Sequence, residues 1–198
     1  MRPNYAQDEP PTAITVGGRS YPCETDWKAW IQVLDRLRKL DVAPSTESGR
    51  TRLLEGILEI ENQVFGGALV QENPLAVLQA VAEFSRGYPQ LPGRSRQTEP
   101  VYSFDYDLND IVVAIWDQHH VDLSYRRKEP FHWWEFLLLF RTLAGEHVIT
   151  NLMQIRGYAG KDKELRRKKR ENALPVEYTD AEKAEYEEFS ALFDSGDE

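Results

Sequence analysis

Apolar side chains recur along the first half of this chain at the three- and four-residue spacing of helices that bury one face. The stripes comprise Trp27, Trp30, Ile31, Leu34 and Leu37, then Leu53, Leu54, Ile57, Leu58 and Val64, then Leu75, Leu78, Val81 and Ala82. Asp26 and Asn73 precede the first and third stripes, where an N-cap would accept free backbone N–H groups. Gly66-Gly67 is expected to end the second helix. The pattern predicts helices over residues 26–86.

A different pattern comes before these helices. Two short runs, 13–16 and 19–23, flank Gly17-Gly18, and glycine readily adopts the positive φ angles of a two-residue turn. We therefore expect a β-hairpin over residues 13–23, with Pro22 on an edge strand because proline has no N–H to donate. Residues 1–12, with three prolines, predict a flexible arm.

The second half is richer in aromatic residues and follows a predicted loop over residues 87–100, which contains three prolines and two glycines. Within 101–160, one expected helix face comprises Leu108, Ile111, Val112, Ile115 and Trp116, and another comprises Val148, Ile149, Leu152 and Met153. Asp107 is the expected cap of the first of these helices. Residues 132–144 are apolar nearly all round, which indicates a helix central to the core or covered by a partner subunit.

The C-terminal part is highly charged. Residues 161–171 predict a basic helix without an apolar stripe, and residues 172–198 an acidic tail, in which 179–193 has the pattern of a helix. With nine acids and one lysine, residues 177–198 account for nearly all of the formal charge of −9, so the body is nearly neutral. The expected fold is mainly α: a helical domain over 13–170 with a short N-terminal β-hairpin and a charged C-terminal helix or tail.

Composition narrows the cellular setting. Cys23 is the single cysteine, so no intrachain disulfide can form, and a reducing cytoplasm is the expected location. The first residues lack the apolar core of a signal peptide, and the apolar run 136–140 is much too short to span a bilayer. We expect a protein without membrane contact.

The histidines and clustered aspartates are the natural candidates for chemistry. His119 and His120 are adjacent and point about 100° apart on a helix, so they cannot easily share a metal ion. Asp105, Asp107 and Asp110 lack the central glycine and distal glutamate of a calcium loop. Helix ends, caps and turns explain these residues more simply, and Asp122 is expected to hold a turn. Since nucleophile, phosphate-binding and dinucleotide-binding motifs are also missing, we expect no enzyme, metal or cofactor.

Trp133, Trp134 and Phe136 follow a short basic turn at 126–128 and admit two interpretations. Exposed aromatics beside cations can stack on nucleic-acid bases, whereas helical aromatics in an apolar run are usually core. Two adjacent tryptophans cannot face the same way, so one is expected in the core and the other against a neighbouring helix or a partner chain. The basic segment 161–172 is the best nucleic-acid candidate, but an acidic segment follows it, and net acidity argues against such binding.

Several short motifs occur in a characteristic order. They are Thr25-Asp26-Trp27 after the hairpin, Tyr102-Ser103-Phe104-Asp105, Asp122-Leu123, His132-Trp133-Trp134-x-Phe136 and Arg156-Gly157-Tyr158. In this order the chain resembles, over roughly 13–170, a bacteriophage family named for gene product fifteen, the tail assembly chaperones of long-tailed phages. The long loop before Val101 and the acidic extension after Leu174 do not map onto that family.

The resemblance implies a protein that works by binding in the host cytoplasm. Its client would be the tape measure protein, which it would keep soluble until tail tube subunits polymerise around it. Self-association and contact with the tail tube protein are further implied. The motif residues, which the resemblance also makes candidates for an interface, are Asp105, Asp122, His132, Trp133, Trp134, Phe136, Arg156 and Tyr158.

Two other function classes remain open. A structural tail or connector component of the virion would also be acidic and self-associating, but tail tubes need extensive β-sheet, and one hairpin is predicted. A host-directed regulator with its basic segment on nucleic acid is the third class, and the net acidity of the chain weakens it.

Overall fold

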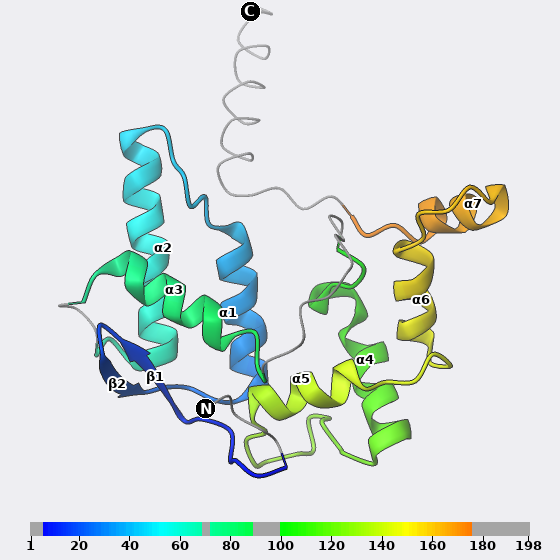
Figure 1. The fold of residues 1–198 in the computed structure, drawn as a ribbon, viewed down its shortest axis with the longest axis horizontal. Coiled ribbons are helices and arrows are strands. Elements are labelled where there is room, and N and C mark those ends of the chain that lie inside the picture. Colours follow the sequence, from blue (N-terminus) through cyan, green and yellow to red (C-terminus); the bar gives the residue numbers. More distant parts are fainter. Residues whose placement is uncertain (1–5, 69–71, 89–99, 176–198) are drawn as a thin grey trace, which may run out of the picture. The chain divides into compact units, whose positions relative to one another are not determined.

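The computed structural model describes residues 6–68, 72–88 and 100–175 (Figure 1). In chain order its elements are β1 (Ala13–Val16), β2 (Arg19–Pro22), α1 (Trp27–Lys39), α2 (Glu47–Phe65), α3 (Pro74–Phe84), α4 (Phe104–His119), α5 (Trp133–Arg141), α6 (Val148–Arg156) and α7 (Lys163–Glu171). The prediction of a mainly helical fold with an N-terminal β-hairpin is confirmed.

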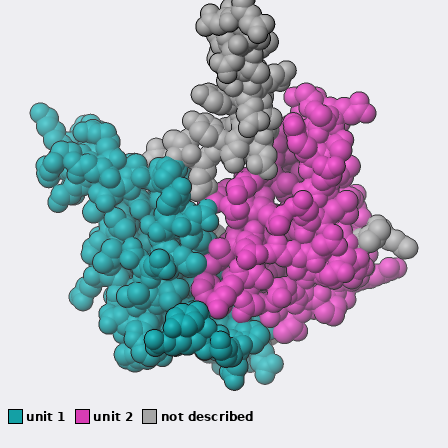
Figure 2. Space-filling view, turned by 180° about the vertical axis from the view of Figure 1, so that it is seen from behind, with its two compact units in different colours: residues 1–10, 87–175 teal, residues 11–86, 176–198 magenta. Residues whose placement is uncertain are grey.

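The chain forms two compact units (Figure 2). Among the described residues, unit 2 comprises 11–86, and unit 1 comprises 87–175 together with 6–10. The division falls at the start of the predicted loop 87–100, of which residues 89–99 lie outside the described residues. The predicted acidic helix over 179–193 also lies outside them.

The hairpin of unit 2 forms as its two glycines require. β1 and β2 are antiparallel, with Val16 opposite Arg19 beside the turn. Gly17 and Gly18 have φ angles of 57° and 84°, which side chains with a Cβ rarely adopt. Ile14 and Val16 are buried on the face of β1 that packs on α3, so the hairpin contributes two side chains to the unit 2 core.

The helices of unit 2 pack around Trp30. Its indole ring stacks on Phe84 with ring centroids 4.8 Å apart, and its Nε1 donates to the carbonyl of Glu24 at 2.8 Å. Asp26 caps α1 and Asn73 caps α3, as predicted. α2 ends at Gly66, whose φ of 63° is left-handed. The buried apolar side chains in the helices of this unit are Trp27, Trp30, Val33, Ile57, Ile60, Val64, Phe65, Val77, Val81 and Phe84, and Glu61 of α2 is buried with them.

Three predicted core positions of unit 2 are wrong. Leu54, Leu58 and Leu75 were expected to face inward, yet their exposed fractions are 49%, 49% and 59%. α2 carries apolar residues on more than one face, and its packing against α1 and α3 buries the face of Ile57 and Ile60 instead. Spacing alone cannot choose between two apolar faces of one helix.

Unit 1 is organised around α5, which buries five of its nine residues. These are Trp133, Trp134, Phe136, Leu137 and Phe140. α4 packs against both α5 and α6, and α6 packs against α7. α7 is different from the other helices of the unit, because none of its residues is buried.

Candidate functional site

The side chains of Ser103 and Asp107 accept backbone hydrogen bonds at the start of α4. Ser103 is the N-cap, and its Oγ accepts the N–H of Asp105 at 3.2 Å. Asp107 lies one turn into the helix, where its Oδ2 accepts the N–H of Ser103 at 2.9 Å. The prediction that Asp107 caps α4 is therefore wrong. The missed signal is a serine followed within one turn by a carboxylate, which is close to the capping-box pattern.

Arg156, the last residue of α6, forms a two-pronged ion pair with Asp107. The Nη1–Oδ2 distance is 2.6 Å and the Nη2–Oδ1 distance is 3.1 Å. The side chains are only 10% and 4% exposed, so each charge depends on the other for compensation. Arg156 also donates to the carbonyls of Val101, at 3.2 Å, and Asn172, at 2.8 Å. One side chain thus joins the start of α4, the end of α6 and the residue that follows α7.

The aromatic residues of two sequence motifs form one cluster between α4 and α5. The ring centroid of Phe104 lies 6.2 Å from that of Trp133 and 5.9 Å from that of Phe136. Tyr102 meets Phe104 and Phe140 edge to face, at 5.3 Å and 4.9 Å. Burial raises the pKa of the Tyr102 hydroxyl, so that hydroxyl stays protonated. The Tyr-Ser-Phe-Asp and His-Trp-Trp-x-Phe motifs therefore meet in the core of unit 1.

His132 and the paired tryptophans set the start of α5. His132 is the N-cap, and its Nδ1 accepts the N–H of Trp134 at 3.0 Å. Trp133 is fully buried, as expected for one of the two rings. Trp134 is buried as well, and its ring meets that of Tyr88 edge to face at 5.0 Å. Within the described structure, neither indole presents a broad surface to a partner.

The other motif residues hold turns and helix starts. Asp122 accepts the N–H of Ser124 at 2.8 Å, and hydrogen bonding from Ser124 lowers the pKa of the Asp122 carboxyl. The Tyr158 hydroxyl accepts the N–H of Asp162, the N-cap of α7, at 3.1 Å. Asp105 is exposed in the first turn of α4, where a carboxylate interacts favourably with the helix dipole.

Most of the motif residues thus support the fold of unit 1. Their predicted role in an interface stays a prediction, and Asp105 is the member most open to solvent.

The histidines lie where helix ends were expected: His119 is the last residue of α4, with its Nε2 3.1 Å from the Leu139 carbonyl oxygen. His120 follows in a left-handed conformation with φ 58°. In the part of the chain that the structure describes, no three His, Cys, Asp or Glu side chains gather as metal ligands would.

The exposed face of α4 is the best candidate for binding a partner. Tyr106, Val113 and Trp116, here called the α4 stripe, are 57%, 64% and 53% exposed. Trp116 was predicted to lie on the buried face, which is wrong: Ile111, Ala114 and Ile115 occupy that face. Spacings of seven and three residues place the stripe along one side of the helix over roughly 15 Å. The sequence signal that could have found it is this second apolar spacing beside the main one.

The N-terminus of α6 lies beside the C-terminal end of α4. Nε2 of His147, the N-cap of α6, is 3.1 Å from Oε1 of Gln118, and its Nδ1 is 3.7 Å from Oδ2 of Asp117. Val148 was predicted to face inward, yet it is 63% exposed, and Ile149 is the buried residue of α6. Asp105 and Asp117 are exposed on α4 as well. Large apolar side chains bordered by acids favour a partner that is apolar with a basic border.

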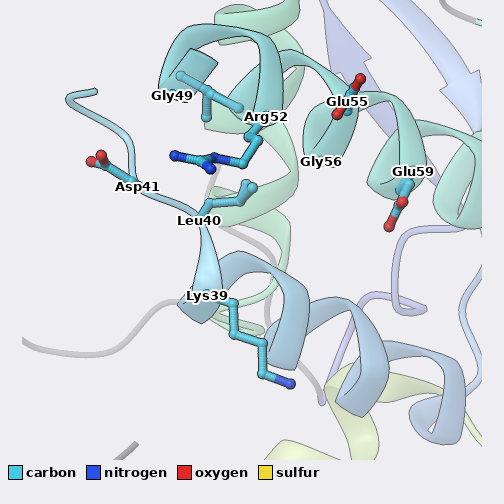
Figure 3. Close-up of a pocket in the computed structure, with 9 residues that line it drawn as sticks. Lys39, Leu40, Asp41, Gly49, Arg52, Glu55, Gly56 and Glu59 are labelled. Atoms are coloured by element: carbon cyan, nitrogen blue, oxygen red, sulfur yellow. The ribbon is translucent and has the colours of Figure 1, made fainter. Parts of the chain in front are cut away.

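Unit 2 offers a smaller surface feature, an open pocket of about 220 Å³ between the end of α1 and α2 (Figure 3). Gly49 and Gly56 of α2 make room for the returning chain, because a Cβ at Gly49 would come within 2.8 Å of Pro44 and one at Gly56 would overlap Leu40. Arg52 extends over Leu40 toward the side of Asp41 in Figure 3. The lining mixes both charge signs without a focal polar group, which is typical of a packing seam and not of a ligand site.

None of the helices in the described segments combines the length and apolar character needed to cross a membrane.

Comparison with known proteins gives a family: the profile of the Bacteriophage Gp15 protein family matches residues 7–179. No curated protein and no solved structure shows significant similarity to the chain. The match spans both compact units, including the capped start of α4, the aromatic cluster and the Asp107–Arg156 pair. The chain therefore belongs to the Bacteriophage Gp15 protein family.

Proposed function

We propose that this virion-related phage protein is a tail assembly chaperone, which binds the tape measure protein and keeps it soluble until tail tube subunits polymerise. The observation that carries the proposal is the exposed α4 stripe. It gives the protein a means of binding a partner without catalysis. The setting of this activity would be the host cytoplasm, where tails assemble.

The physical match lies in the helical nature of the client. A long helical protein without its tube exposes apolar stripes that would otherwise aggregate. Tyr106, Val113 and Trp116 can lie along two or three turns of such a helix, with tyrosine and tryptophan as the anchors. Several copies side by side would be needed to cover a long client, so the proposal includes self-association.

The test is co-expression of the full chain with the tape measure protein of the same phage, followed by size-exclusion chromatography of the soluble fraction. The wild-type chain is expected to co-elute with a soluble client. The triple variant Tyr106→Ser, Val113→Ser, Trp116→Ser is expected to leave the client insoluble, because the stripe is its contact surface. All three side chains are exposed, so the triple variant should itself remain folded.

Two controls locate the effect. Tyr125→Ser removes the most exposed of the large hydrophobic residues in the described structure, 80% exposed and outside α4, and should leave the client soluble. Leu54→Ser with Leu58→Ser removes the exposed apolar pair on α2 and tests whether unit 2 contributes. If the stripe variant solubilises the client as well as the wild type does, α4 is not the binding surface.

The alternative function is a structural tail or connector component of the virion. Purified mature tails distinguish the two functions, because a chaperone is absent from them and a structural component is present at a fixed ratio. A protein that neither co-elutes with the tape measure protein nor rescues it, yet occurs stoichiometrically in tails, would be a structural component.

A further inference from the structure

One face of α7 is entirely basic. Lys163, Arg166, Arg167 and Arg170 follow the i, i+3, i+4, i+7 spacing that places side chains on one side of a helix. All four are exposed. Counting every residue, α7 has six cations and two acids, a net charge of +4 in a chain whose total is −9. We call these four residues the α7 basic face.

The residues of α7 outside this face hold the helix on unit 1. Leu165 and Lys169 are its only partly buried residues, and Lys169 Nζ donates to the carbonyl of Tyr158 at 3.5 Å. Arg167 pairs with Glu164 and Glu171 on its own helix. Among the described residues, neither Lys163 nor Arg170 forms an ion pair. Within the basic face, Arg166 Nε donates to the carbonyl of Gly160, just before α7, at 3.1 Å. The four side chains of the face nevertheless remain exposed.

The structure also places the beginning of the acidic tail. Asn172, directly after α7, accepts a 2.8 Å hydrogen bond from Nε of the buried Arg156, which ties the exit of the helix to unit 1. Residues 176–198 follow within a few positions and carry nine acids and one lysine. The first six of these acids lie within 177–188. Twelve residues are enough to run the length of α7, because its nine helical residues span about 14 Å and twelve residues of chain can reach farther than that.

We propose that the α7 basic face is the docking surface for the acidic tail of the same chain, with residues 177–188 running antiparallel to α7. This direction brings the later acids to the N-terminus of α7, where the helix dipole favours negative charge. Individual surface ion pairs are weak, but a short tether gives the tail a high effective concentration at the helix. The docked tail neutralises the strongest positive surface of unit 1 and shields it from polyanions.

The inference goes beyond the proposed function and does not depend on it. Other occupants of the basic face are a nucleic acid or the tail of a second copy, and these are outcomes of the test. The intrachain tail is favoured because its charge is opposite, its starting point is held beside the helix, and its length suits the face.

The experiment is zero-length cross-linking of the full chain with a carbodiimide, which joins carboxylates to lysine amines in direct contact. A mixture of ¹⁴N- and ¹⁵N-labelled chains separates intrachain from interchain products by mass spectrometry. We expect intrachain cross-links from Lys163 to acids of the tail. We also expect their yield to fall on the order of tenfold at ~1 M salt, where the screening length is about 3 Å.

A matched pair of variants tests the surface. Arg166→Glu with Arg170→Glu reverses the basic face while leaving Lys163 as the reporter, and should reduce the cross-links on the order of tenfold. Arg126→Glu with Lys128→Glu makes the same charge change on exposed residues between α4 and α5. This control should leave the yield of tail cross-links at Lys163 unchanged. The salt series on the wild-type chain decides the question if the α7 variant loses helicity by circular dichroism. Interchain cross-links, insensitivity to salt and reversal, or equal yields at Lys28 and Lys128 would each overturn the proposal. Protection of Lys163 only when a polyanion is added would assign the face to nucleic acid instead.

Discussion

Unit 1 and unit 2 are stabilised by different kinds of buried side chain. The unit 2 core is mostly aliphatic around the Trp30–Phe84 stack, with Glu61 of α2 as its buried acidic side chain. Unit 1 buries an aromatic cluster together with the Asp107–Arg156 ion pair, whose members are 49 residues apart in sequence. Most of the motifs that carry the family resemblance belong to unit 1. Those motifs largely position α4, α5 and α7, while the surface that we propose for binding, the α4 stripe, consists of other residues.

The largest expected effects come from removing the central tryptophan of each unit. Trp133→Ala and Trp30→Ala should each lower the free energy of unfolding by about 3–5 kcal/mol, because each leaves a large cavity. Trp30→Ala also leaves the Glu24 carbonyl without its indole donor. Hydrogen exchange followed by mass spectrometry should show the loss of protection concentrated in the unit that carries the substitution. An equal loss in α3 and α5 for both variants would mean that the two cores do not behave as separate units.

Breaking the buried ion pair should have the next largest effect. Arg156→Ala is expected to cost about 3 kcal/mol, since it leaves the Asp107 carboxylate buried without its cation. Urea unfolding of the full chain measures this change. Arg126→Ala, at an exposed position, is the control and should stay within about 0.5 kcal/mol of the wild type. Similar stability of the two variants would show that the pair contributes little to unit 1.

Removing one helix cap in each unit should have a smaller effect on the free energy of unfolding, of similar size in both units. Ser103→Ala in unit 1 and Asn73→Ala in unit 2 should each cost about 1 kcal/mol, because each leaves helix N–H groups without a side-chain acceptor. The Ser103 variant retains the backbone hydrogen bond to Asp107, so its cost should not exceed that of the Asn73 variant. Thermal unfolding gives both values, with Ser20→Ala on the exposed strand as the control. A much larger loss for Ser103→Ala would indicate that its hydroxyl also orders the ion pair.

The smallest expected effect concerns Cys23 of unit 2. Burial raises the pKa of its thiol to about 12, and the negative charge of Glu24 adds to the shift. At pH 8 its reaction with iodoacetamide should be at least roughly tenfold slower than in the urea-unfolded chain, because the thiolate is the reactive form. The same shift makes a contribution to stability that is present below the unfolded pKa of about 8.5 and declines as the pH rises toward 12. Equal rates in the folded and unfolded chains would contradict the burial of the thiol.

Sequence reasoning succeeded where the cause of a structure is local. The Gly17-Gly18 turn, the Asp26 and Asn73 caps and the end of α2 at Gly66 each depend on a few neighbouring residues, and all were predicted. The prediction that Asp107 caps α4 was wrong, because its carboxylate instead accepts from Ser103 and pairs with Arg156. Its place one turn into the helix is local, but its ion pair with Arg156 joins residues that only the folded chain brings together.

The sequence by itself determined the secondary structure, the mainly helical class and the family, because propensities, caps, turns and motif order act over short stretches of chain. The tertiary structure alone decided which apolar side chains face solvent. Leu54, Leu58, Leu75 and Trp116 fit a helical stripe as well as their buried neighbours do, and only the packing of other helices selected the buried face. The physical reason is that spacing gives the faces of a helix, whereas burial depends on which face finds a partner. The candidate binding surface on α4 is a product of that selection.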